Sequence, residues 1–471
     1  MNAFARDLIR VVVVNLAVKP AWILTENMVQ NAIGHHEYGR YAALFALTFI
    51  LATLLDPGLT SYATREIAAD NPDRQKLFST VLWIKIGLSM VFPIVVLATM
   101  TLLGYCDVEL GMLLAALQIC VGLTAFFRGA MQGMHLFAAD AFFSVADKAF
   151  LFVPLLIFWS GLTAERFAAL NFGAACASLI AAAWVVRKRL RFSPSSFRSV
   201  ADTLWRSRHF ALMVLLYNVL DRINPILVER RTGAEAAGLY AGAYRWFSAF
   251  CMYLWMVLPI FYAKFAKLRD HRLPTRGLPF VAIPMIWVGG FCIFHGDKLL
   301  FLFSRSAPDQ LTTMSETLSI LGATLILAGT HNIFSTFLTA TGNENAVNVL
   351  ICAAITANVV VFYAFPASNG TVAGAWGALA SHAVLFAGYP ATFVRFSRTS
   401  FPLTVLTRVA VFCGAYIAIL SLTQNWTWWI SVASAVGFSG VIAVLFWGRS
   451  DVWFEGDRPT NGPCDGRAED G

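Results

Sequence analysis

Charged side chains inside long apolar runs are the residues of this sequence that could do chemistry. Lys19 and Glu26 lie in one such run, Asp221 and Arg222 in a second, and Arg245 in a third. Inserting an ionisable side chain into a bilayer costs about 2.5–3.5 kcal/mol, so these groups are expected to face a protein interior or a water-filled cavity. There they could bind a charged ligand or pair with one another.

Two of these runs share one polar pattern. The spacing Asn-x3-Lys/Arg-x6-Glu occurs twice, at Asn15, Lys19 and Glu26 and at Asn218, Arg222 and Glu229. At 100° per residue, positions i, i+4 and i+11 of a helix lie within about 40° of one another. Each helix therefore presents one polar stripe, which predicts a cavity-facing Lys19. For Asp221 beside Arg222, a cavity role and an internal salt bridge that only fixes helix packing both stay open.

Arg245 is the strongest single candidate for an anion contact in a central cavity. It lies about two turns into its apolar run, too far from either end to reach the membrane interface. A guanidinium is planar and carries several N–H donors, so it suits bidentate binding of a phosphate.

Prolines and one Asp-Pro-Gly sequence interrupt the apolar runs. Pro20 and Pro225 stand beside the polar stripes and can bend their helices, which frees carbonyl groups that a polar cavity could satisfy. In the second run, Pro57 removes a backbone donor, Gly58 lets another helix come close, and Asp56 is placed to accept from freed amides or a nearby base. We predict a hinge or gate here; a purely structural kink is the alternative.

Other ionisable residues give weaker signals. Lys85 is near enough to the end of its run to snorkel to the interface. His331 and His382 stand isolated in separate runs, which is more typical of satisfied core histidines than of the alternative, a proton relay. Most cysteines fall inside apolar runs, and no Walker A motif is present, so we expect no disulfide framework, metal, cofactor or direct use of ATP.

The elements that must position these residues are membrane-spanning helices. The chain is 58% hydrophobic and 13% charged, against about 25% charged in soluble domains. Apolar runs of about 20 residues recur along its length, so the sequence predicts an all-α polytopic membrane protein. Fourteen spans are expected, at 8–32, 38–66, 77–104, 110–132, 139–160, 165–187, 208–230, 236–263, 279–303, 312–339, 345–366, 371–394, 402–422 and 427–448.

Lysine and arginine gather in alternate loops, above all in 187–208 and 264–276. Cytoplasmic loops of membrane proteins carry this excess, so both termini are predicted to be cytoplasmic. The net charge of +8 then faces an anionic inner leaflet and does not require a nucleic acid. Because all loops are short, the sequence offers no room for a soluble catalytic domain, and we expect no enzyme.

The two halves of the chain resemble each other. Gly34 to Ala42 and Gly233 to Ala241 share Gly-x4-Gly-x-Tyr-Ala at an offset of 199, and Gly133 matches Gly342 at an offset of 209. Chance matches of glycine and alanine are the alternative to a duplication with its axis along the membrane normal. The predicted parts are an N-terminal six-helix bundle at 1–190, a basic cytoplasmic linker at 191–207, a C-terminal six-helix bundle at 208–396, two accessory helices at 397–448 and a disordered cytoplasmic tail at 449–471.

This pattern resembles a known family. It combines fourteen helices, a duplicated six-helix half, Asp-x-Gly at 56–58 followed by Arg-Glu-Ile-Ala at 65–68, Arg-x4-Gly at 128–133, and Gly-x-Tyr-Ala. Together these features look like the Wzx-type polysaccharide and O-antigen flippases of the multidrug/oligosaccharidyl-lipid/polysaccharide exporter superfamily.

The resemblance implies two bundles around a central cavity that opens alternately to each side of the bacterial inner membrane. The substrate would be an undecaprenyl-pyrophosphate-linked oligosaccharide, flipped for O-antigen or exopolysaccharide assembly, and other assembly proteins would be partners besides membrane lipids. Lys19, Arg222 and Arg245 would then contact the anion. An ion gradient would drive transport, and Glu26, Asp147 and Asp221 would bind the coupling ion or form internal salt bridges.

Three alternatives remain. A multidrug or cation antiporter of the same superfamily usually has twelve helices and a more acidic cavity. A lipid II flippase would share both the fourteen helices and the basic cavity. A membrane glycan polymerase or glycosyltransferase would need a sizeable external loop with catalytic carboxylates or histidines, which the short external loops disfavour.

Overall fold

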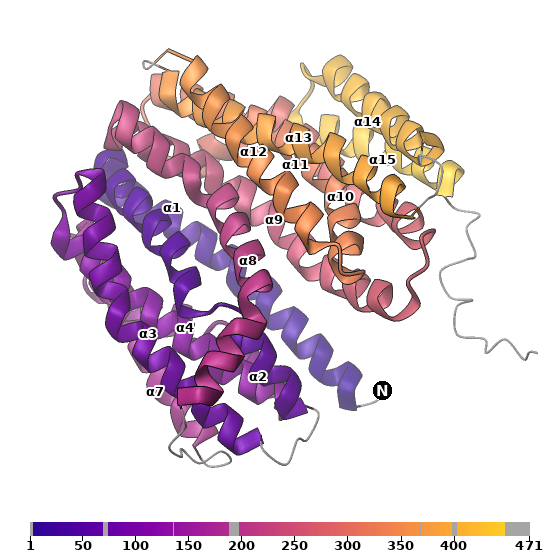
Figure 1. Ribbon diagram of the computed structural model, residues 1–471. Helices are drawn as coiled ribbons and strands as arrows, with labels where there is room; N and C mark the ends of the chain where they lie inside the picture. Colours follow the sequence, from indigo (N-terminus) through magenta and orange to yellow (C-terminus); the bar gives the residue numbers. More distant parts are fainter. Residues whose placement is uncertain are drawn as a thin grey trace, which may run out of the picture. The chain divides into compact units, whose positions relative to one another are not determined.

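The computed structural model describes residues 3–68, 74–134, 136–187, 197–366, 369–397 and 403–447, and this part is helical without a strand (Figure 1). Within these ranges the side chains of 3–20, 61–62, 65–66, 68, 137, 197–211, 263 and 442–447 are outside the description. The predicted disordered tail at 449–471 also lies outside the described residues.

The first half of the chain contains the first six predicted spans. Its elements are α1 (Ala3–Leu51), the 3-10 helix η1 (Ala52–Leu55), α2 (Leu59–Ala68), α3 (Arg74–Leu103), α4 (Val108–Gly133), α5 (Phe137–Phe143), α6 (Ala146–Ile157) and α7 (Ala164–Val186). α1 holds two helices, because Gly34 takes a non-helical conformation in its middle. The predicted span 139–160 is divided between α5 and α6.

The second half continues with longer helices. They are α8 (Phe197–Thr232), α9 (Ala234–Leu268), α10 (Leu273–Phe303), α11 (Pro308–Ala340), α12 (Glu344–Ala364) and α13 (Gly370–Ser397). α11, α12 and α13 pack side by side (Figure 1). α8 begins inside the predicted linker 191–207. Residues 1–402 form one compact unit, and α14 (Leu403–Thr423) packs with α15 (Trp428–Trp447) in a second.

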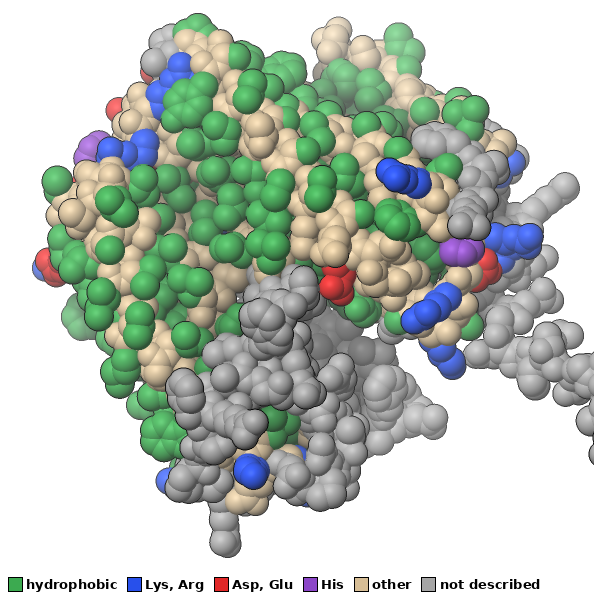
Figure 2. All heavy atoms as spheres, viewed as in Figure 1, with side chains coloured by type: hydrophobic (Ala, Val, Ile, Leu, Met, Phe, Trp, Pro, Cys, Tyr) green, Lys and Arg blue, Asp and Glu red, His purple; other side chains and the backbone are tan. Residues whose placement is uncertain are grey.

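The chain is an all-α polytopic membrane protein. Ten described segments are long and apolar enough to cross a membrane. The fourteen predicted spans exceed this number by four, because α1 contains two of them, α5 and α6 divide one, α8 carries several charged residues, and the apolar described part of α15 is short. Figure 2 shows a face on which hydrophobic side chains far outnumber charged ones, as contact with lipid requires.

The two repeated glycine motifs meet in the structure. Gly34 and Gly233 have nearly the same conformation, with φ 84° and ψ 165° in the first and φ 93° and ψ 171° in the second. A Cβ on Gly39 would lie 1.7 Å from the Ala234 carbonyl oxygen, and one on Gly238 would lie 1.9 Å from the His35 carbonyl oxygen. Since Ala234 is the counterpart of His35 at the offset of 199, α1 and α9 cross by a reciprocal backbone contact that only glycine permits.

The Asp-Pro-Gly sequence separates η1 from α2. Asp56 Oδ1 accepts a hydrogen bond from the Thr60 amide at 3.0 Å, and Asp56 Oδ2 lies 3.2 Å from Lys85 Nζ. Lys85 also donates to the Leu55 carbonyl at 3.2 Å and is 1% exposed. The expected role of Asp56 as a partner for a freed amide and a base is confirmed.

Two details of that region differ from expectation. The prediction that Lys85 snorkels to the interface is wrong, because Asp56 and a backbone carbonyl that has no helical partner compensate its charge inside the fold. The structure also shows that the backbone conformation, and not close helix packing, explains the glycine at position 58. Its φ of 80° lies in the left-handed region, which side chains with a Cβ rarely adopt.

Candidate functional site

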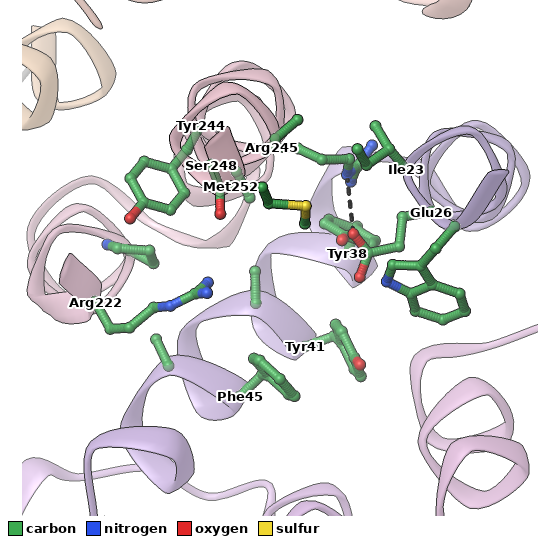
Figure 3. A pocket seen from close by; sticks show the side chains of 16 residues that line it. Ile23, Glu26, Tyr38, Tyr41, Phe45, Arg222, Tyr244, Arg245, Ser248 and Met252 are labelled. Atoms are coloured by element: carbon green, nitrogen blue, oxygen red, sulfur yellow. Dashed lines mark ion pairs between the residues drawn. The ribbon is translucent and has the colours of Figure 1, made fainter. Parts of the chain in front are cut away.

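A cavity of about 190 Å³ lies among α1, α8 and α9, where the two halves meet (Figure 3). It is lined by Trp22, Ile23, Glu26, Tyr38, Tyr41, Ala42, Phe45, Ala46, Arg222, Pro225, Ala241, Tyr244, Arg245, Ser248, Ala249 and Met252. Both helical parts of α1 contribute, because the break at Gly34 turns the chain back along the cavity wall. The charged residues predicted from separate apolar runs therefore converge on one space.

Arg245 is held by polar groups of α1. Its Nη1 donates to Asn27 Oδ1 at 2.7 Å and its Nη2 donates to Gln30 Oε1 at 2.8 Å. Its Nε lies 3.5 Å from Glu26 Oε2, at the distance of an ion pair, and its guanidinium carbon lies 4.8 Å from the centre of the Tyr38 ring. The side chain is 4% exposed, so Arg245 connects α9 to α1 as well as lining the cavity.

Arg222 is the more available cation. Its Nε lies 2.9 Å from Asp221 Oδ2, and its guanidinium carbon lies 5.1 Å from the ring centre of Phe49 and 5.7 Å from that of Tyr244. Its two terminal nitrogens have no hydrogen-bond partner among the described residues, and its side chain extends toward the cavity centre (Figure 3). These nitrogens can therefore bind an anion without first losing a hydrogen bond.

Asp221 is oriented by a tyrosine. The hydroxyl of Tyr244 donates to Asp221 Oδ1 at 2.6 Å and to the Asp221 backbone carbonyl at 2.7 Å. Tyr244 thus fixes the carboxylate that in turn fixes the Nε side of Arg222. Of the charged residues on the cavity wall, Glu26 is negative and Arg222 and Arg245 are positive, so the lining has a net positive charge.

Four of the eleven predicted site residues line the cavity, and Asp221 is joined to them by its ion pair with Arg222. Pro225 lines the cavity, as do Glu26, Arg222 and Arg245. Asp147 does not: it pairs with Lys148 at 3.1 Å and lines a separate pocket of about 150 Å³ that also includes Arg128.

The remaining predicted residues lie apart from the cavity or cannot be assigned to it. Asp56, Pro57 and Gly58 form the η1–α2 break and are not among the cavity-lining residues. Lys19 and Pro20 lie on α1, and their side chains are outside the described part of the structure.

Sequence reasoning missed the neutral residues that hold Arg245. Asn27 and Gln30 stand one and four positions after Glu26, and this local cluster of polar residues in an apolar run was an available signal. His331 is a core histidine, as predicted, but the pairing of the two histidines was not foreseen: His331 Nε2 lies 2.9 Å from His382 Nδ1 between α11 and α13. Fifty-one residues separate the two, so only packing brings them together.

Comparisons with known proteins identify the sequence family and the fold. The sequence profile of a family described as "Polysaccharide biosynthesis protein" matches residues 4–261, more than half of the chain. A comparison with curated protein sequences finds no match.

Solved structures resemble the chain over most of its length. The lipid II flippase MurJ in an inward closed conformation has a TM-score of 0.70 at 11% identity, covering 93% of this chain and 99% of its own. An inward-facing multidrug resistance MATE family transporter of the MOP superfamily has a TM-score of 0.67 at 15% identity, covering 82% and 99%. A MOP superfamily transporter from Pyrococcus furiosus has a TM-score of 0.53 at 15% identity, covering 83% and 96%. At such identities the likeness establishes the fold alone.

Proposed function

We propose, from the premise that this chain belongs to the polysaccharide biosynthesis protein family, that it is a flippase for lipid-linked oligosaccharides. Its substrate is an undecaprenyl-pyrophosphate-linked oligosaccharide, which it moves from the cytoplasmic to the periplasmic leaflet of the bacterial inner membrane. The product serves O-antigen or exopolysaccharide assembly, with other assembly proteins as partners. Both termini are cytoplasmic in this proposal.

The observation that carries the proposal is the pair of unoccupied terminal nitrogens of Arg222 inside a cavity of net positive charge. Each phosphate of a pyrophosphate is tetrahedral, and two of its oxygens can accept two parallel hydrogen bonds from the planar fork of one guanidinium. The aromatic side chains of Trp22, Tyr38, Tyr41 and Phe45 line the same space and offer apolar faces to sugar rings. A cation would meet two arginines here, which disfavours a cation antiporter.

The size of the cavity indicates what must move. Ligand pockets for drug-sized molecules span about 300–1,000 Å³, and this cavity has about 190 Å³. An oligosaccharide can therefore enter only after α1 has moved away from α8 and α9. The Arg245 contacts with Asn27 and Gln30 and the glycine crossing hold α1 against α9, so both belong to the closed side of an alternating-access cycle.

Coupling to an ion gradient would act on the acidic groups of the same network. Glu26 and Asp221 each compensate an arginine while no substrate is bound. A substrate pyrophosphate would compete for those arginines and leave a carboxylate free to bind a coupling cation. Asp147, which pairs with Lys148, would contribute from its separate pocket in the first half.

Charge reversal at Arg222 tests the proposal. Proteoliposomes containing a fluorescent undecaprenyl-pyrophosphate-linked oligosaccharide would report flipping as exposure of the label to a membrane-impermeant quencher. We expect Arg222→Glu to reduce the flipping rate at least about 100-fold and Arg222→Lys, which keeps the charge but loses the fork, about tenfold. Lys298→Ala, a half-exposed residue paired with Asp297 away from the cavity, is the matched control.

Unchanged flipping by Arg222→Glu would refute the anion contact. Release of sugar phosphate or extension of the glycan by the purified protein would refute the transporter assignment. Lipid II offered in the same assay separates the peptidoglycan alternative, because preferred flipping of lipid II would assign the chain to that pathway.

A further inference from the structure

A second concave site lies outside the central cavity, between α1 and α6. This α1–α6 groove has a volume of about 220 Å³ and is lined by Ala21, Trp22, Thr25, Lys148, Ala149, Leu151, Phe152 and Leu155. Its walls are apolar except for a threonine and a lysine. Thr25 already donates to the Ala21 carbonyl at 2.8 Å, so Lys148 is the one charged group in the groove.

Trp22 separates the groove from the cavity. The same side chain lines both spaces. Its ring lies 6.5 Å from the ring of Phe167 with an interplanar angle of 12°, and Lys148 Nζ lies 4.2 Å from its ring centre. A movement of one indole ring would therefore join the groove to the cavity that contains Arg222.

The charge of Lys148 is energetically costly at this position. It stands near the middle of the apolar run that α5 and α6 share, where a charged side chain is costly unless it has a partner. Its partners are the Asp147 carboxylate at 3.1 Å and the face of Trp22, and one third of its side chain remains exposed. Simple packing would be served by an apolar residue, so a partly exposed lysine in this groove points to an anionic ligand.

The groove also opens to the side of the protein that meets lipid. Phe152, Val153, Leu156 and Ile157 on α6 are each more than half exposed. Such a surface is compatible with acyl or isoprenoid chains and not with water. The groove thus combines an apolar channel that lipid can reach with one cation at its inner end.

We propose that the α1–α6 groove binds a polyprenyl phosphate lipid, with the first isoprene units along the apolar walls and the phosphate at Lys148. The phosphate replaces Asp147 as the partner of the ammonium, and Trp22 then separates the bound lipid from the cavity. This deepens the proposed function, on which it rests: it assigns a lateral waiting site for the substrate's lipid end. Charge complementarity and the shared wall with the cavity carry the choice of this ligand.

Photolabelling tests the proposal without requiring transport. The full-length protein in nanodiscs would be exposed to a polyprenyl phosphate that carries a diazirine on its first isoprene units and no sugar. We expect the label on the α6 and α1 residues of the groove. Ala149→Trp, which fills the groove from an exposed position, should lower this labelling about tenfold, and Lys148→Met should lower it about fivefold.

The control is Ile180→Trp on α7, an equally bulky change at a lipid-facing residue that is 70% exposed and does not line the groove. It should leave the labelling unchanged. Lys148→Met needs no extra volume, so it keeps the test valid if Ala149→Trp does not fold. Equal labelling of wild type and Lys148→Met would overturn the proposal, as would complete competition by phosphatidylglycerol at a similar concentration, which would make this an ordinary phospholipid site.

The outcome is separable from that of the flipping assay. Groove labelling that persists in Arg222→Glu supports the lipid site whether or not that variant flips the oligosaccharide. Suppose that the wild type labels in the groove but does not flip the oligosaccharide, and that Lys148→Met loses the labelling. This result would support the lipid site and refute only the proposed function. Full flipping by a protein whose groove never labels would refute only the lipid site.

Discussion

The two halves of the molecule present different side chains to the cavity. At the offset of 199 the glycine motifs align in the sequence, and counterparts that both line the cavity include Ile23 and Arg222, Phe45 and Tyr244, and Ala46 and Arg245. The first half supplies aromatic and apolar walls, and the second supplies the arginines. The second half therefore carries the positive charge, and Asn27 and Gln30 of the first half accept hydrogen bonds from Arg245.

The second helix also differs between the two halves, in its continuity. In the first half it is broken between η1 and α2, whereas its counterpart α9 continues from Ala234 to Leu268 although it contains Pro259. Proline alone thus does not end a helix here. The break in the first half also has Gly58 in a left-handed conformation and the Asp56–Lys85 pair. These added features distinguish the interrupted helix from the continuous one.

The glycine crossing gives the largest expected effect. Gly39→Val and Gly238→Val would each place a branched side chain into a backbone carbonyl of the other half, which no rotamer can avoid. We expect each to lower the free energy of unfolding by more than about 4 kcal/mol, with little protein recovered in a monodisperse state. Fluorescence-detected size exclusion and thermal unfolding in detergent measure this.

Gly173→Ala, at a helical position with open space around it, is the control and should be nearly neutral. Because the contact is reciprocal, the two valine variants should be equally damaging. A mild effect of one and a severe effect of the other would show that the halves do not share this contact equally.

Removing the Lys85 charge should have the next largest effect. Lys85→Met would leave Asp56 with its amide contact but without its cation, and we expect a loss of about 3 kcal/mol of unfolding free energy, since Asp56 is partly exposed. The double variant Lys85→Met with Asp56→Asn should recover part of the loss. Chemical denaturation monitored by tryptophan fluorescence would decide, and an additive double variant would contradict the pair.

Arg245→Met breaks the connection between the halves on the cavity side. It leaves the side-chain oxygens of Asn27 and Gln30 without their donors, so we expect a loss of about 2 kcal/mol of stability and faster labelling of a cysteine at Ala46. Ser248→Ala, also on α9 and lining the cavity, is the control and should change neither quantity. Unaltered cysteine labelling in Arg245→Met would mean that Arg245 does not hold α1 against α9.

The histidine pair should give the smallest effect. His331 and His382 correspond, at the offset of 209, to Gly122 and Gly173, so the pair belongs to the second half alone. A double-mutant cycle with His331→Phe and His382→Phe should give a coupling of about 1 kcal/mol in unfolding free energy. A coupling energy near zero would mean that the two rings are neighbours whose hydrogen bond does not stabilise the fold.

The sequence was sufficient where the physics is local. Apolar runs identified an all-α membrane protein and located the ten described segments that are long and apolar enough to cross a membrane, because the length and hydropathy of a span depend on its own residues. The role of Asp56 was also accessible, since the amide that it caps is four residues away. The cavity residues Glu26, Arg222 and Arg245 were identified because a charge in an apolar run has few stable alternatives.

Contacts across the fold were not accessible in this way. Lys85 was expected at the interface and is buried against Asp56, twenty-nine residues earlier in the chain, because the η1 break leaves a carbonyl and a carboxylate that compensate it. The charge of Asp147 predicted an ionic role, but the sequence did not predict where in the fold Asp147 lies. Its partner Lys148 also contacts Trp22 on another helix, α1, and this contact depends on helix packing. Such pairings depend on helix rotation and depth, which hydropathy does not specify.

The crossing of Gly39 and Gly238 also bears on how such a chain could arise. If both halves descend from one six-helix ancestor, the two glycines were once the same codon, and the contact lay on the twofold axis of a homodimer. Every change at that codon would then have altered both sides of the interface at once. Fusion of the two copies would then have freed the positions around it to differ, as Ala46 and Arg245 do, while the crossing kept both glycines necessary.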